Sequence, residues 1–150
     1  MQTNMVMASI GCMLAFLFVS GCNVYDVSEL KYDPELKQVC LVDNSNVIVD
    51  EFVTNLEDEF NDRRIKVKHV DKFYEPAQGE YLVKYTARQS WDFSTYLSYA
   101  QIRIYKDNAP VAQGTYRHRG GSFSLALNKW NCVSGKMAPL YSELFKEYNK

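Results

Sequence analysis

Apolar residues recur with a helical period in two parts of the chain. The first stripe has the i, i+3, i+4, i+7 and i+11 spacing of an amphipathic helix and consists of Val49, Phe52, Val53, Leu56 and Phe60. Asn46 is the expected N-cap of this helix, and Arg63 and Arg64 lie at its expected C-terminal end. The second stripe predicts a C-terminal helix and consists of Met137, Leu140, Tyr141, Leu144, Phe145 and Tyr148. Pro139 suits only the first turn of such a helix.

A short apolar run at 37–43 predicts a strand before the first helix, and after that helix apolar and polar residues alternate with the period of two that is typical of strands. The predicted strands cover residues 37–43, 65–69, 80–89, 95–105, 111–118 and 122–127. Helices that pack on one face of a sheet bury both apolar stripes at once. The pattern therefore predicts an α+β two-layer sandwich, in which a largely antiparallel sheet of four to six strands carries two amphipathic helices on one face.

An apolar run at residues 5–19 comes before all of these elements. Its 15 residues are fewer than the ~20 that a membrane-spanning helix needs, and they suit the apolar region of a secretory signal. The following residues, Val19-Ser20-Gly21-Cys22, resemble the lipobox of bacterial lipoproteins. The resemblance implies a signal peptide at 1–21, cleavage between Gly21 and Cys22, a diacylglyceryl group on the Cys22 thiol and acylation of the new amino group.

The residue after Cys22 is Asn23 rather than Asp, which by resemblance to enterobacterial lipoproteins implies sorting to the outer membrane. The domain is then expected in the periplasm or at the cell surface. Residues 22–36 show no sustained period and predict a lipidated tether, followed by a single α+β domain at 37–150. The stretches 90–105 and 125–130 also resemble uncharacterised small proteobacterial envelope lipoproteins, a likeness that implies no mechanism.

Four cysteines occur in the chain. Cys12 leaves with the signal peptide and Cys22 carries the lipid, so Cys40 and Cys132 remain. Because disulfides persist outside the cytoplasm, these two are the expected pair, and closing their loop would stabilise the fold by roughly 4–5 kcal/mol. Two buried free thiols are the alternative.

Composition and charge narrow the functional classes. The formal net charge of −1 indicates no polyanion partner, so nucleic acid is not expected. The 11 Tyr, 8 Phe and 2 Trp suit a sheet-rich fold. His69 and His118 are the only histidines, and neither stands at a metal-ligand spacing, so no metal or other cofactor is expected.

Two short stretches hold the candidate binding residues. Trp91 and Phe93 lie in a polar segment, where docking on the core is the favoured interpretation and an exposed aromatic patch is the alternative. Arg117, His118 and Arg119 could form a basic loop that holds an anion, although an ordinary polar strand end is favoured.

These observations favour a non-enzymatic outer-membrane lipoprotein that acts as a binding or accessory module in the cell envelope. Its expected partners are the membrane, through the lipid on Cys22, and an envelope protein. Two alternatives stay open. One is a small envelope hydrolase or ligand-binding lipoprotein that uses His69 or His118, and the other is an immunity or exclusion lipoprotein that masks a receptor.

Overall fold

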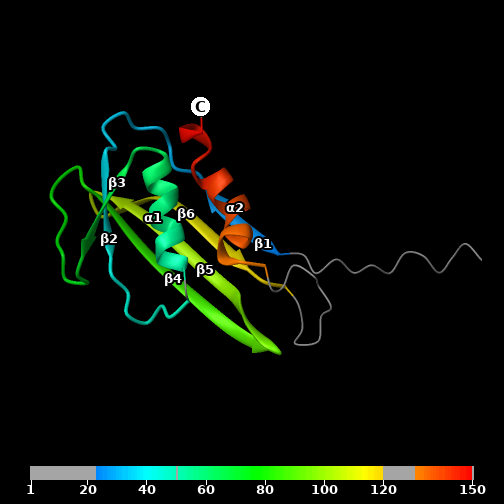
Figure 1. Ribbon diagram of the computed structural model, residues 1–150. Helices are drawn as coiled ribbons and strands as arrows, with labels where there is room; N and C mark the ends of the chain where they lie inside the picture. The colour runs from blue at the N-terminus through cyan, green and yellow to red at the C-terminus, as the bar shows by residue number, and fades with distance from the viewer. Residues whose placement is uncertain (1–22, 50, 120–130, 150) are drawn as a thin grey trace, which may run out of the picture.

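A single mixed sheet organises the chain, as the computed structural model shows for residues 23–49, 51–119 and 131–149 (Figure 1). The six strands lie in the order β1-β6-β5-β4-β2-β3. Their bounds are β1 Val24–Ser28, β2 Gln38–Val42, β3 Lys66–Val70, β4 Tyr81–Asp92, β5 Ser94–Lys106 and β6 Ala109–Arg117. Two helices, α1 Phe52–Asp62 and α2 Val133–Leu144, and a final 3-10 turn at Lys146–Tyr148 complete the fold. The α+β class expected from the sequence is confirmed.

The sheet is antiparallel from β1 to β4 and parallel from β4 through β2 to β3. Two parallel strands need a crossover connection of a dozen or more residues, and α1 supplies it between β2 and β3. The predicted order of strand, helix and strand was correct, and the helix between these two strands is the reason why they pair in parallel.

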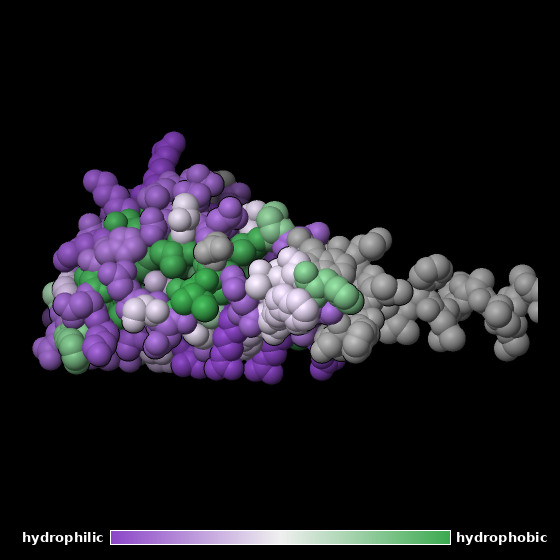
Figure 2. Space-filling model, turned by 60° about the horizontal axis from the view of Figure 1, so that its bottom comes forward, coloured by the Kyte–Doolittle hydropathy of each residue, from purple (hydrophilic) through white to green (hydrophobic). Residues whose placement is uncertain are grey.

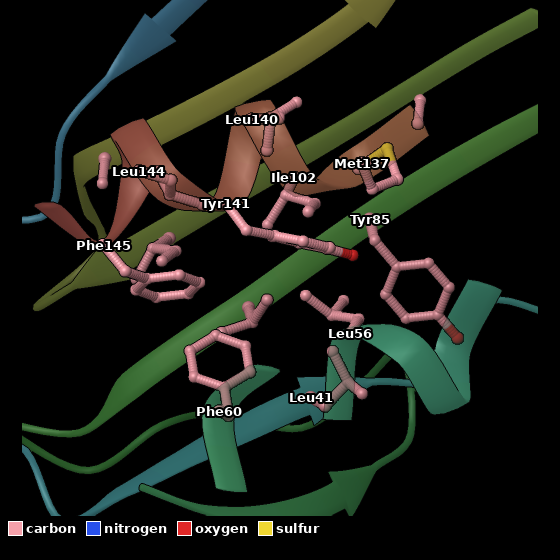
Figure 3. Close-up of a cluster of buried hydrophobic side chains, with 14 of the residues drawn as sticks. Leu41, Leu56, Phe60, Tyr85, Ile102, Met137, Leu140, Tyr141, Leu144 and Phe145 are labelled. Carbon is pink, nitrogen blue, oxygen red and sulfur yellow. The ribbon is translucent and has the colours of Figure 1, made fainter. Parts of the chain in front are cut away.

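Both helices cover the same face of the sheet, and the core lies between the two layers (Figures 1 and 3). Leu56 and Phe60 from α1 and Leu140 and Tyr141 from α2 are fully buried, and Figure 3 shows them converging over Ile102 of β5. The rings of Phe60 and Phe145 meet nearly edge-on, with centroids 5.2 Å apart. The two apolar stripes thus form one continuous core.

The segment at 23–36, expected to be an irregular tether, contains β1 instead. Its five residues pair with β6 in register from Val24 opposite Arg117 to Ser28 opposite Gln113. Beyond the strand, Leu30 and Leu36 are buried, and the amide of Leu30 donates to the Leu144 carbonyl at 2.8 Å. The tether prediction is therefore wrong for these residues. The predicted signal peptide, Gly21 and Cys22 lie outside the described residues, as does the predicted strand at 122–127.

Both helix starts differ from the sequence prediction. The first helix begins at Phe52 rather than after Asn46, and Glu51 before it has a left-handed backbone with φ of 64°. Helix α2 begins at Val133, which places Pro139 in its second turn rather than in its first. Val49, the first residue of the predicted stripe, is buried although it lies before α1.

The predicted bridge between Cys40 and Cys132 is absent, and both residues are free thiols. Side chains alternate between the two faces of a strand, and Val39 and Leu41 face the helices. Cys40 therefore faces the other side, where it is buried against Val70 and Leu82. Cys132 is exposed at the start of α2, on the helix side. The sheet thus separates the two sulfur atoms.

We expect the two thiols to differ in reactivity. A hydrogen bond with the Ser134 hydroxyl lowers the pKa of the exposed Cys132 thiol, so maleimide should modify Cys132 in the folded protein and Cys40 only after unfolding. Peptide mass spectrometry would assign each adduct. Recovery of a peptide that contains Cys40 linked to Cys132 would contradict the structure.

A close approach of β6 to α2 gives a second test. A Cβ on Gly114 would lie 2.6 Å from Leu140 Cδ2, so Gly114→Ala should lower the free energy of unfolding by about 1–3 kcal/mol through overpacking. Chemical denaturation measures this loss. Adding Leu140→Val should cost less in Gly114→Ala than in the parent protein, because it makes room for the new methyl group. Equal costs in the two backgrounds would show that the contact is not tight.

Candidate functional site

The β4–β5 hairpin ends in two exposed aromatic side chains. Trp91 is 73% exposed and lies opposite Thr95 near the end of β4, and Phe93 is 81% exposed at the turn itself. Both strands run past the lower ends of the helices in Figure 1, so this tip has no helix layer to pack against. The favoured expectation that these rings dock on the core is wrong, and the alternative of an exposed aromatic patch is correct.

The backbone at the tip is unusual for the residue that occupies it. Phe93 has φ of 58°, in the left-handed region that bulky side chains rarely adopt. Glycine or asparagine is the ordinary choice at such a turn position. A non-glycine residue held there costs about 1–3 kcal/mol. Keeping a phenylalanine at this position is consistent with a use for its side chain in binding.

The three residues of the predicted basic loop have different surroundings and do not share one contact. Arg117 ends β6, and its guanidinium lies 5.8 Å from the centroid of the Tyr99 ring. His118 Nδ1 lies 3.0 Å from Asn23 Oδ1, and the His118 ring meets the Tyr96 ring at 5.3 Å. Arg119 is exposed. His118 therefore joins the start of the described chain to the base of the hairpin.

A second surface, which sequence reasoning missed, is the sheet face opposite the helices. We call it the open face and define it by the outward-facing residues of β4, β5 and β6 between the hairpin base and the far end of the sheet. They are Leu82, Lys84, Thr86, Arg88, Tyr99, Gln101, Arg103, Tyr105, Gln113, Thr115 and Arg117. Four of these residues are cations and none is a carboxylate, whereas Asp26 of the adjacent strand β1 lies opposite Thr115 and faces the same side.

Cations and tyrosines alternate across neighbouring strands of the open face. The Lys84 ammonium lies 5.4 Å from the centroid of the Tyr105 ring, and the Arg88 guanidinium lies 5.5 Å from that of Tyr99. Arg103 donates to Gln113 Oε1 at 3.2 Å. A shallow hollow of about 180 Å³ lies among these side chains. The open face is thus a polar, positively charged and aromatic surface.

Helix α1, on the other side of the sheet, is rich in carboxylates. Helix α1 carries Glu57, Asp58, Glu59 and Asp62. The net charge of −1 therefore does not reveal the row of cations on β4, β5 and β6. The expectation that no polyanion partner is indicated was based on that sum, and it stays a prediction.

His69 is held between two carboxylates. Its Nδ1 lies 2.6 Å from Asp43 Oδ1 and its Nε2 lies 2.9 Å from Glu57 Oε1. The hydrogen bond with Asp43, and the negative charges of Glu57 and Asp43, raise the pKa of His69. Because both ring nitrogens are engaged, this geometry favours a protonated structural link between β2, β3 and α1 over a general base.

Another cavity offers no set of groups suited to catalysis. It has a volume of about 680 Å³, is open to solvent, and is lined by side chains of both charges, including Arg63 and Glu147. Arg63 is already paired with Glu59 Oε2 at 2.7 Å. Within the ranges that the structure describes, no three potential metal ligands cluster.

The link at His69 predicts a pH dependence. A raised pKa in the folded state means that the stabilisation is fully present below the ordinary histidine pKa of about 6.5 and is lost as the pH rises through the raised value. Asp43→Asn should lower the pKa of His69, as measured by NMR titration of the ring protons. The His118 signals serve as the internal control, because Asp43 does not contact that ring. An unchanged His69 titration would show that the contact with Asp43 does not persist in solution.

Known proteins resemble this chain in fold only. No family model matches the sequence, and no curated protein matches it. Among solved structures, a single-residue variant of the PelC dodecamer from Paraburkholderia phytofirmans matches with a TM-score of 0.50 and 13% identity, over 80% of this chain and 98% of that chain. A second PelC dodecamer structure matches with a TM-score of 0.48 and 11% identity, over 80% and 99%. A minor lipoprotein from Acinetobacter baumannii matches with a TM-score of 0.31 and 13% identity, over 75% and 88%. The first of these matches shows that a PelC chain shares the fold described above.

Proposed function

We propose that this chain is a non-enzymatic, lipid-anchored module of the outer membrane that binds an acidic protein partner through the open face of its sheet. The observation that carries this proposal is the row of Lys84, Arg88, Arg103 and Arg117 on three adjacent strands. Asp26 of β1, opposite Thr115, is a carboxylate at the border of this row. The helices leave this face uncovered, since both pack on the opposite side.

The composition of the open face supports a protein partner. Tyrosine and arginine are enriched in the centres of protein interfaces and among the residues that contribute most to binding. Here Tyr99 lies between Arg88 and Arg117 and is within cation–π distance of both. Such a row gives a partner with surface carboxylates both charge complementarity and a defined register.

The anchor is the second part of the proposal. The lipobox at Val19-Ser20-Gly21-Cys22 supports acylation of Cys22, and two or more acyl chains give stable membrane attachment. Across the described residues, no helix is long and apolar enough to span a bilayer. Acylation would thus attach the domain to the envelope, where the partner is expected.

Photo-crosslinking in cells tests the binding face. A photoreactive residue in place of Gln101, at the centre of the open face, should form one discrete adduct with an envelope protein, which mass spectrometry identifies. The purified partner should then bind about tenfold or more weakly to Arg103→Glu, and this difference should shrink at high salt.

A matched charge reversal provides the control. Arg64 is exposed outside the open face, so Arg64→Glu should leave the affinity unchanged. Equal losses for Arg64→Glu and Arg103→Glu would reduce the effect to net charge and contradict the binding face. The solved PelC chains form dodecamers, so the adduct could instead contain a second copy of this chain. That result would contradict a different protein as the partner and indicate that the open face mediates self-assembly.

A further inference from the structure

The aromatic tip and the start of the chain lie at the same end of the sheet. Strand β4 runs toward the tip, β5 returns from it, β6 runs toward it again and β1 leads away. One row across the sheet places Arg88 opposite Tyr99, Tyr99 opposite Arg117, and Arg117 opposite Val24. Val24 is the first residue of β1, so the chain enters the domain from the side to which the hairpin projects.

From this row, the distance to the hairpin tip can be compared with the distance that the chain can span to Cys22. Four residues separate Arg88 from Asp92 at the tip, which is about 13 Å at roughly 3.3 Å per residue. Cys22 is two residues before Val24, and two residues span at most about 7 Å. With the strands upright on a membrane, the tip therefore reaches at least about 6 Å beyond the Cα of the cysteine that would carry the acyl chains.

Contacts at this end hold the two features together. Asn23 follows Cys22 directly and lies 3.0 Å from the His118 ring, which packs on Tyr96. Tyr96 is next to Thr95, the strand partner of Trp91. Asn23, the residue that follows the site of acylation, and the aromatic tip thus belong to the same end of the sheet.

The side chains at this end suit the interface of a bilayer. Trp91 and Phe93 are the exposed rings, and amphipathic tryptophan is enriched at the level of the lipid headgroups. Arg88, Arg117 and Arg119 are exposed behind them, where they can attract anionic headgroups. Asp92, the carboxylate at the turn, is only 8% exposed. Figure 2 turns this lower end toward the reader and shows hydrophobic side chains reaching the surface there.

We infer that Trp91 and Phe93 insert into the phospholipid leaflet that holds the acyl chains of Cys22, as a second membrane contact of the domain. The inference rests on the proposed lipid anchor, because the anchor brings the bilayer to this end of the sheet. A reach of at least about 6 Å is enough to enter the ~5–10 Å depth to which interfacial segments bury their apolar side chains. The bilayer thus covers two rings that the fold leaves in water.

Fluorescence of Trp91 tests the insertion. Trp130 is the other tryptophan, so the acylated protein with Trp130→Phe has Trp91 as its single reporter. The protein is reconstituted into vesicles of phosphatidylethanolamine and phosphatidylglycerol, with and without bromine on the acyl chains. We expect blue-shifted emission in the unbrominated vesicles. We also expect strong quenching by lipids brominated near the headgroup and weaker quenching by lipids brominated near the methyl end.

The matched control moves the reporter to the opposite end. Tyr32 lies in the segment after β1, away from the tip, and is 60% exposed. In the protein with Trp91→Phe, Trp130→Phe and Tyr32→Trp, the emission should stay red and unquenched. Quenching at both positions would indicate general surface adsorption and overturn the insertion of the tip.

Mass spectrometry of the same sample separates the two proposals. Unmodified Cys22 would contradict the proposed anchor, whatever the fluorescence shows. Unquenched Trp91 in an acylated protein would overturn the insertion while leaving the anchor intact, and the aromatic tip would then have to contact another protein.

Discussion

The antiparallel pairing of β4 with β5 is the constraint on which the other features depend. These strands have 12 and 13 residues and extend past the two helices that cover them. Their inner residues form the floor of the core, their outer residues form the charged and aromatic open face, and their excess length becomes the tip. A register shift between Arg88 and Gln89 marks the transition from sheet body to tip.

The parts of the fold that could be predicted are those that bury apolar surface with a clear period. The stripes of α1 and α2 and the alternation in β3 to β6 follow directly from burial on one side, and the apolar run of β2 follows from burial on both. Strand β1 could not be recognised, because it is a five-residue edge strand with mostly half-buried side chains, and its order comes from pairing with β6. The predicted disulfide was wrong for a related reason. The face of the sheet on which Cys40 lies depends on its position in β2, and the location of Cys132 depends on where α2 packs.

The candidate site was only partly predictable. Trp91 and Phe93 were singled out by their chemistry, but whether they are buried depends on where the helix layer ends, which no local pattern reports. The open face was missed because its cations come from three strands and are distant from one another in sequence. Only strand order and register bring Lys84, Arg103 and Gln113 side by side. A net charge sums over the whole surface and therefore cannot reveal a local row of cations.

The early start of β1 has a mechanical consequence. Pairing with β6 begins at Val24, so a pulling force applied at Cys22 would load the β1–β6 ladder along the strand direction. In this shear geometry the hydrogen bonds resist together, whereas unzipping would break them one after another. The Tyr25 hydroxyl, which donates to the Lys136 carbonyl at 2.9 Å, and the Leu30 amide, which donates to Leu144, add resistance from α2. A lipid attached here would thus be joined to the core through a load-bearing strand, and the domain could transmit tension between the membrane and a bound partner without first uncoiling a linker.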